Sequence, residues 1–181
     1  MSDTLTGMRE TDELQRHVHA AIEGDNVAFE HIVKSTQPAV WRLCASLGSA
    51  GVEEDLVQET YLRAIKSLPG FRFEVPVQAW LLSIARRVCA DDVRKRQRSR
   101  RLADRLELSA GDGVTIDDDS VEHILDGLEP DRREAFVLTQ VMGLSYEEAA
   151  EVMSCPIGTV RSRVARARAD LAVVVARTMA V

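Results

Sequence analysis

The sequence predicts an all-α protein made of two small helical domains joined by a flexible linker. Apolar residues recur at helical spacing in almost every segment of the 181-residue chain. No segment shows a convincing alternation of apolar and polar residues, which is the pattern of a half-buried strand. The helical pattern is interrupted by a stretch rich in Gly and Asp, residues 99–119, which is typical of a linker. We therefore expect one domain over residues 1–98 and a second over residues 120–181.

The composition excludes several classes of protein. A hydrophobic content of 45% is enough to form hydrophobic cores. The sequence contains no run of 18 apolar residues, so no membrane-spanning helix is predicted. The N-terminal residues lack the basic patch and apolar stretch of a signal peptide. Cys44, Cys89 and Cys155 are an odd number and widely spaced, so they predict free thiols in a reducing compartment. We expect a cytoplasmic protein that does not associate with a membrane.

The charge is distributed unevenly, although the whole chain carries a formal net charge of −6. Residues 1–75 hold 12 acids and 7 bases, a net of −5, and residues 111–160 hold 12 acids and 2 bases, a net of −10. Residues 76–110 hold 9 bases and 4 acids, a net of +5, and residues 161–181 reach +4 with 5 bases and 1 acid. Two basic stretches, each after an apolar helical pattern, indicate a polyanion as partner.

The first helical block runs from about Glu10 to Arg98, with interruptions at residues 47–51 and 68–76. On a helical wheel of the middle segment, the core face consists of Val57, Tyr61, Ala64 and Leu68, with Ile65 at its edge. Leu62 lies on the opposite face among acids and amides. An exposed leucine ringed by charges is typical of a protein interface, where an apolar anchor supplies affinity and charges fix the register.

The next helix of this block combines an apolar and a polar sector. Its inward positions are Trp80, Leu81, Ile84 and Val88. The polar sector can follow a phosphate backbone, and it consists of Ser83, Arg86, Arg87, Arg94 and Gln97. The loop before this helix contains Phe71 and Phe73, which can belong to the core with Trp80.

The second helical block runs from about Ser120 to Ala176 and contains clear start and stop signals. Residues 117–120 offer an N-cap, Pro130 can start a helix, and Gly143 can end it. Ser145 and Glu148 have the spacing of a capping box.

A short helix over residues 146–153 then follows, with Ala149, Ala150 and Met153 inward. Pro156 can occupy the first position of the next helix. A short helix, a tight turn and a longer helix form the helix-turn-helix arrangement.

The last helix presents two different faces. One seam toward the core consists of Val160, Val164, Ala167 and Leu171. The outward face has small residues at its centre and arginines around it. Small residues let a helix approach the major groove closely, and arginine offers paired donors to guanine edges and phosphates. This residue pattern therefore predicts that the helix binds DNA and recognises its bases.

Three segments resemble the extracytoplasmic-function (ECF, sigma-70 group 4) RNA polymerase sigma factors. "LSYEEAAEVMSCPIGTVRSRVARARADL" is similar to their region 4, the helix-turn-helix that reads the −35 element. "EEDLVQETYLRAI" is similar to their core-polymerase-binding segment in region 2, and "AWLLSIARRVCADDVRKRQR" to their −10-reading helix. The segments occur in the family's order and spacing, and the resemblance covers roughly residues 25–98 and 120–175.

The resemblance implies two domains, a region 2 helical bundle and a region 4 helix-turn-helix. It implies that the chain binds core RNA polymerase, at the β′ clamp helices and the β flap, and directs initiation at promoter DNA. The implied contacts with core polymerase are Asp55, Gln58, Glu59, Leu62 and Arg63. The implied contacts with the melted −10 strand are Ser83, Arg86, Arg87, Arg94 and Gln97. The implied contacts with the −35 duplex are Thr159, Arg161, Ser162, Arg163, Ala165, Arg166 and Arg168. An anti-sigma factor is a further expected partner, and no cofactor or metal is implied.

Two other functions stay open at the level of the sequence. One is a stand-alone helix-turn-helix regulator that binds operators as a dimer, and the other is an adaptor whose basic stretches bind acidic proteins. The helix over residues 55–63 argues against the first, because an operator-binding regulator has no use for such a face. An enzyme is not expected, since the sequence contains no phosphate loop, nucleophile elbow or zinc signature. His17 and His19 are two residues apart and cannot chelate one metal from a helix.

Overall fold

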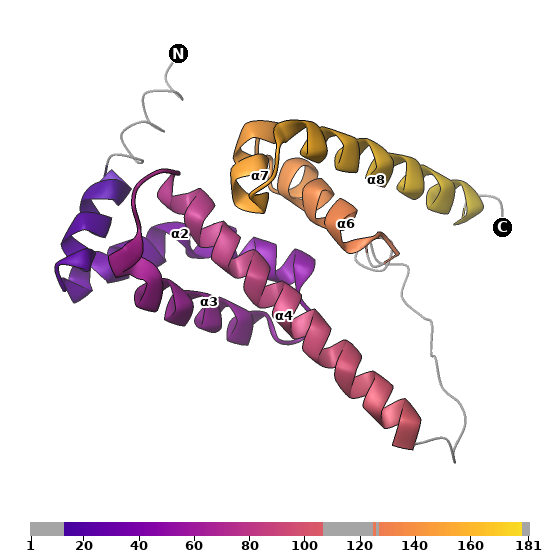
Figure 1. Cartoon of the computed structure of the whole chain (residues 1–181), viewed down its shortest axis with the longest axis horizontal. Coiled ribbons are helices and arrows are strands. Elements are labelled where there is room, and N and C mark those ends of the chain that lie inside the picture. The colour runs from indigo at the N-terminus through magenta and orange to yellow at the C-terminus, as the bar shows by residue number, and fades with distance from the viewer. Residues whose placement is uncertain (1–12, 107–124, 126, 179–181) are drawn as a thin grey trace.

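The computed structural model describes residues 13–106, 125 and 127–178, and the described residues form helices and short connections without a strand. A first helix spans residues 13–22. The helices that follow it in the N-terminal half are α2 (Asn26–Leu47), α3 (Glu53–Ser67), η1 (Leu68–Gly70) and α4 (Val77–Leu106). The C-terminal half contains α6 (Pro130–Phe136), η2 (Val137–Val141), α7 (Tyr146–Met153) and α8 (Ile157–Thr178). The predicted all-α class is confirmed (Figure 1).

The first helical block has a break that the sequence prediction missed. Gly24 adopts φ +99°, which ends the helix over residues 13–22. The Asp25 carboxylate then accepts hydrogen bonds from the backbone N–H groups of Val27 and Ala28, at 2.8 and 3.1 Å. Asp25 is therefore the N-cap of α2, and this cap lets the chain turn between two helices that pack on each other.

The core of the N-terminal half is formed where α2, α3 and α4 pack together. Val57, Tyr61, Ala64 and Leu68 are all buried, as the helical wheel predicted. The Tyr61 hydroxyl lies 2.8 Å from the hydroxyl of Thr36 on α2, so this buried polar group is hydrogen-bonded across the core. Burial raises the pKa of Tyr61 above its ordinary value. The tyrosine is thus a neutral core residue.

α4 is longer and more deeply buried than its sequence pattern indicated. It continues to Leu106 rather than ending at Arg98, so the start of the predicted linker is helical. Leu81, Ile84 and Val88 are buried as predicted, and Trp80 is partly buried against the same core. Leu82, Ala85 and Cys89 are also buried, at 1% exposure or less. Ala85 and Cys89 widen the face that packs in the core of the N-terminal half, and α4 also packs against α7, so it contacts neighbours on more than one side.

The start of α6 follows its sequence signals. Pro130 occupies the first helical turn, and the Glu129 side chain accepts a hydrogen bond from the backbone N–H of Arg132. The last turn of this helix is a π-helix, η2, and Gly143 ends it with φ +75°. The predicted N-cap at residues 117–120 lies outside the described residues.

α7 and α8 form the predicted helix-turn-helix. The capping box is confirmed, because Ser145 Oγ accepts from the Glu148 N–H at 3.1 Å and the Glu148 carboxylate accepts from the Ser145 N–H at 2.8 Å. Two details differ from the prediction. Val152, rather than Ala150, is fully buried with Ala149 and Met153. Pro156 precedes the helix, which begins at Ile157, and its carbonyl accepts the first helical bonds.

The two halves of the chain pack directly on each other. α7 lies against α4, η2 lies against the C-terminal part of α2, and α8 packs on α6 and α7 (Figure 1). The buried apolar residues of both halves form one continuous core. Within the described residues, no helix is long and apolar enough to cross a bilayer.

We expect Ser145→Ala to lower the free energy of unfolding by about 1 kcal/mol, because it removes the side-chain acceptor of the α7 capping box. Urea unfolding followed by circular dichroism measures this change. Ser35→Ala is the control, since Ser35 is exposed within α2 and bonds only to carbonyls of its own helix. An equal loss in both variants would contradict the role of the cap.

Candidate polymerase and nucleic-acid interfaces

The outward face of α3 contains the residues that the sequence assigned to core-polymerase binding. Leu62 is 48% exposed, and the structure adds Ile65 at 44%, which the helical wheel had placed at the edge of the core. Asp55 and Gln58 are exposed on the same helix, and Glu59 is half-buried. Two exposed apolar side chains beside acids and an amide give this face the anchor and the charged rim of a docking surface.

Arg63 is held in place by two carboxylates. Its Nε donates to Glu59 Oε1 and its Nη1 donates to Asp91 Oδ2 of α4, both at 2.7 Å. Asp91 also accepts from Arg94 at 2.6 Å. The guanidinium groups of Arg63 and Arg94 hold the pKa of Asp91 below its ordinary value, and Asp91 and Glu59 raise the pKa of Arg63. This network ties the α3 face to the basic side of α4.

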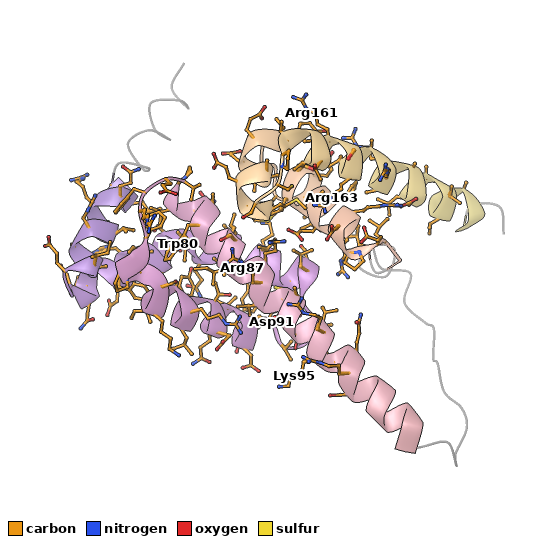
Figure 2. The ribbon with its side chains drawn as sticks, viewed as in Figure 1. Trp80, Arg87, Asp91, Lys95, Arg161 and Arg163 are labelled. Carbon is orange, nitrogen blue, oxygen red and sulfur yellow. The ribbon has the colours of Figure 1, made fainter. Side chains whose placement is uncertain are left out.

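The five residues assigned to −10 recognition have different surroundings on α4. Arg87, Arg94 and Gln97 are exposed, and Figure 2 shows Arg87, Asp91 and Lys95 at successive turns of the helix. Arg87 makes no hydrogen bond or ion pair with the described residues. Ser83 donates its hydroxyl proton to the Trp80 carbonyl at 2.7 Å. Arg86 is partly covered, and its Nη1 lies 3.1 Å from the carboxylate of Glu134 on α6.

The aromatic residues before α4 form a half-buried cluster. The ring of Phe71 lies 4.8 Å from the rings of Phe73 and Trp80, and His19 stacks on Phe73 at 4.1 Å. Phe73 has φ +59°, a left-handed conformation that is unusual for an aromatic residue. Packing of these rings therefore holds the loop in an otherwise unfavourable backbone conformation.

α8 presents the residues assigned to the −35 duplex. Val160, Val164 and Ala167 are buried and Leu171 is half-buried, so the predicted seam is confirmed. On the opposite face, Thr159 is partly exposed, and Ser162, Ala165 and Arg166 are exposed. Figure 2 shows Arg161 at the outer edge of α8, on the side away from α4.

The four arginines of α8 whose side chains the structure describes are not equivalent. Arg163 bonds to Asp131 of α6, and Arg168 Nη2 donates to Gln140 Oε1 at 2.6 Å. The Arg161 guanidinium lies 5.9 Å from the centre of the Tyr146 ring, a cation–π distance. Arg166 is exposed and has no partner among the described residues. Among its described side chains, the helix therefore offers one free guanidinium and three that are oriented by α6, η2 and α7.

Comparisons with known proteins support the two-part organisation. Residues 32–99 match the family model described as Sigma-70 region 2, and residues 118–171 match Sigma-70, region 4. The ECF RNA polymerase sigma factor SigC of Mycobacterium tuberculosis is 46% identical over 155 residues, which cover 82% of this chain and 84% of that protein. The chain belongs to the ECF sigma factors. This family consists of transcription initiation factors that bind promoter DNA together with core RNA polymerase.

Two solved sigma factor structures have a similar fold. CnrH in complex with the cytosolic domain of CnrY matches with a TM-score of 0.72 and 28% identity, over 91% of this chain and 98% of CnrH. The sigma factor RpoE of Bartonella quintana, in complex with the anti-sigma factor NepR, matches with a TM-score of 0.62 and 32% identity, over 79% of this chain and 93% of RpoE.

Sequence reasoning missed the partners that orient the arginines of this sigma factor. Asp131, Gln140 and Tyr146 each contact one arginine of α8 from another helix. It also missed Glu134, which contacts Arg86 across the two regions. The acidic excess of residues 111–160 was the available signal, but a sequence pattern does not specify which acid meets which base.

The histidines of the first helix contact different neighbours. The ring of His17 stacks on that of His31 at 4.7 Å, whereas His19 stacks on Phe73. The two histidines have different neighbours because residues two positions apart on a helix point in different directions. Among the described residues, no group of three or more His, Cys, Asp and Glu side chains could hold a metal ion. The described cysteines Cys44, Cys89 and Cys155 are free thiols, as expected.

Arg63→Met should raise the pKa of Asp91 toward its ordinary value. Of the two arginines that lower this pKa, Arg63 has the larger effect, and the variant removes it. A carboxyl whose folded pKa is lowered adds stability above its unfolded pKa, and that stability is lost as the pH falls through the folded pKa. The variant should therefore be less sensitive to acid at this site. Carboxyl NMR titration measures the pKa. Lys66→Met, an exposed change on the same helix, should leave Asp91 unaffected.

Proposed function

We propose that this chain recruits core RNA polymerase through the outward face of α3 and selects promoters with α4 and α8. The observation that carries this proposal is the set of three separate faces with different chemistry on one chain. The first is apolar and acidic, the second is basic and follows a long helix, and the third is a helix-turn-helix surface of small residues and arginines. A dimeric operator-binding regulator would use only the third.

The polymerase contact consists of Asp55, Gln58, Glu59, Leu62 and Arg63, and its partner is the β′ clamp helices. Leu62 supplies the buried apolar anchor when the complex forms, and the exposed Ile65 extends that anchor along the helix. The carboxylates fix the register and speed the encounter with a basic partner. Arg63 acts partly through its ion pairs, which keep the acidic side chains in a fixed arrangement. The β flap is a second contact of the polymerase with region 4.

The −10 contact consists of Ser83, Arg86, Arg87, Arg94 and Gln97. Arginines along one side of α4 neutralise the phosphates of the melted non-template strand, which releases counterions. Capture of an unstacked base near Phe71 and Phe73 would offset part of the cost of opening the duplex, about a few kcal/mol. The half-buried aromatic cluster supplies rings against which such a base can stack.

The −35 contact consists of Thr159, Arg161, Ser162, Arg163, Ala165, Arg166 and Arg168. Arg166, which is free and central on the exposed face, is the principal base-reading residue. Arg161 and Arg168 lie at the flanks, where phosphates run beside the groove. Arg163 is tied to Asp131 and keeps α8 correctly oriented on α6.

We also propose where and how the chain works. It acts in the cytoplasm, where polymerase and promoter DNA are present, and it catalyses no reaction of its own. The anti-sigma factor NepR, bound in the RpoE structure, supports an anti-sigma factor for this chain as well. Such a partner would cover both the apolar and acidic face of α3 and a basic surface.

Run-off transcription with core polymerase tests the proposed function. Core enzyme plus this chain should start at defined sites on fragments of the source genome, whereas core enzyme alone should not. Failure to start at a defined site on any fragment would overturn the proposal and favour an operator-binding regulator or an adaptor.

We expect Leu62→Glu to abolish binding to core polymerase while the helix content remains unchanged, because a charge replaces the exposed apolar anchor. Co-elution with core polymerase measures binding and circular dichroism measures folding. Val27→Glu is the matched control, since Val27 is 62% exposed on α2, away from the proposed contact. Retained binding by the Leu62 variant would exclude this face as the polymerase contact.

Arg166→Ala should cost about 1–3 kcal/mol on the matched −35 site and relax the base preference there. Arg168→Ala should weaken binding to all sequences alike and reduce the slope of log affinity against log salt concentration by roughly one unit. Holoenzyme titrations on promoter fragments with single −35 substitutions, at several salt concentrations, separate the two effects. Uniform loss with unchanged base preference in both variants would mean that α8 is only a cationic clamp.

A further inference from the structure

The first helix presents an aromatic side chain that none of the interfaces proposed above includes. His19 is exposed, and its imidazole lies on the ring of Phe73 with a centroid distance of 4.1 Å and an interplanar angle of 15°. Among the described residues, no other ring stacks on His19. One face of the imidazole is therefore covered by Phe73, and the other face is open to solvent.

His19 is the outer end of a row of four rings. Phe73 contacts Phe71 at 4.8 Å, and Phe71 contacts Trp80 at the start of α4, also at 4.8 Å. The loop that holds the two phenylalanines runs between the first helix and the start of α4 (Figure 1). The three inner rings are half-buried against the core, whereas the last ring is exposed. A row that is held at its inner end and open at its outer end offers a stacking position for one more flat ring.

Two arginines border the exposed ring. Arg72 directly precedes Phe73 in the loop, and Arg16 lies one helical turn before His19, on the same side of the first helix. Both arginines are exposed, and neither forms a hydrogen bond or an ion pair with the described residues. Their guanidinium groups are therefore available to an anion that approaches the ring.

Acidic side chains limit where an anion can approach. Glu23 lies about one turn after His19, and Glu74 directly follows Phe73; both are exposed. These carboxylates repel phosphates, whereas the arginines at the preceding positions attract them. A polyanion that reaches the exposed ring is therefore guided to the arginine side.

A single nucleic-acid strand is the ligand that fits this combination of an open ring and unpaired cations. Every unpaired base has a flat π-face, and stacking of bases on aromatic side chains contributes strongly to the binding of single strands. Histidine is one of the side chains on which unstacked bases lie. An acidic peptide would neutralise the arginines but leave the ring face open, and a duplex keeps its bases stacked on each other.

We propose that His19 is a base-contacting residue of the −10 interface. The outer face of its imidazole stacks on an unstacked base of the melted strand, and Arg16 and Arg72 bind the phosphates beside that base. His19 lies outside residues 32–99, which match region 2, so the interface extends from α4 across the loop to the first helix. This inference rests on the proposed function, because it takes the melted −10 strand as the ligand.

An abasic scan of the strand tests the stacking contact. The probes are fork-junction fragments of a promoter that run-off transcription has mapped, each lacking one base of the −10 non-template strand, and they are titrated with holoenzyme. At one position, removal of the base should weaken binding by the parent holoenzyme about tenfold, as expected for the loss of one stacked base. Holoenzyme with His19→Ala should bind the intact probe about tenfold more weakly, and the same abasic position should then have no further effect.

Two further variants separate stacking on a base from support of the loop. His19→Phe keeps a flat ring and should retain the abasic effect. His17→Ala removes the other imidazole of the same helix, which stacks on His31, and should leave strand binding unchanged. If His19→Ala weakens binding to intact and abasic probes equally, His19 only supports the loop and the proposal is overturned. Loss of the abasic effect in His17→Ala would overturn it as well.

The salt dependence of binding tests the two arginines. Arg16→Ala and Arg72→Ala should each reduce the slope of log affinity against log salt concentration by roughly 0.7, the value for one phosphate contact with a single strand. Arg42→Ala is the control, since Arg42 is an exposed arginine in the C-terminal half of α2 without an ion pair among the described residues. Equal slopes for the parent and all three variants would overturn the phosphate contacts.

The outcomes distinguish this inference from the proposed function. If the parent holoenzyme starts at no defined site, the proposed function fails and this inference fails with it. If the parent starts at a defined site and every abasic position has the same effect in His19→Ala as in the parent, the captured base lies elsewhere. In that case only the contact with His19 is refuted.

Discussion

The packing of α4 on more than one side is the constraint on which the rest of the structure depends. This helix closes the core of region 2 with Leu81, Ala85 and Val88, it packs against α7, and its Leu82 lines a cavity together with Val152 of α7. Its remaining surface is basic and partly paired with acids from α3 and α6. Exposed side chains of α4, such as Arg87 and Arg94, are the part of this helix that a partner can reach. The polar residues that stay exposed therefore decide what this helix can bind.

The arginines on the surface fall into two groups, those paired with a carboxylate of the chain and those without such a partner among the described residues. Arg63 and Arg163 are fixed by carboxylates on neighbouring helices, so their guanidinium groups mainly organise the faces around them. Arg87 and Arg166 have no such partners among the described residues and project from exposed positions. Because a guanidinium bound to a carboxylate has already satisfied its strongest donors, the free arginines are the ones that can respond to a nucleic acid.

The acidic net charge and the DNA-binding role are compatible because the charges are separated along the chain. Acids gather on the face of α3 and on α7, while bases gather on α4 and α8. Acidic surfaces suit protein partners and the intramolecular contact, and they repel DNA from places where it should not bind. Selective binding thus depends on where each charge is located rather than on the total.

Much of this protein was determined by local sequence. The helical spacing of apolar residues predicted the all-α class and the seam of Val160, Val164 and Ala167, because burial of one face is a property of a single helix. The capping box at Ser145 and Glu148 and the positive φ of Gly143 were also predictable, since they involve only neighbouring residues. The three candidate faces followed from the same patterns and from resemblance to sigma factors.

The tertiary structure decided which side chains meet across the fold. The ion pair of Arg86 with Glu134 joins residues 48 positions apart, and the hydrogen bond from Arg133 to Ser46 spans 87. Both Arg86 and the exposed Arg87 are arginines of the same helix in the same sequence context, yet only Arg86 faces α6. The sequence determines which helices form and which of their faces are apolar. Which polar residues face a partner within the chain depends on how whole helices pack, because that packing minimises exposed apolar surface over all of them together.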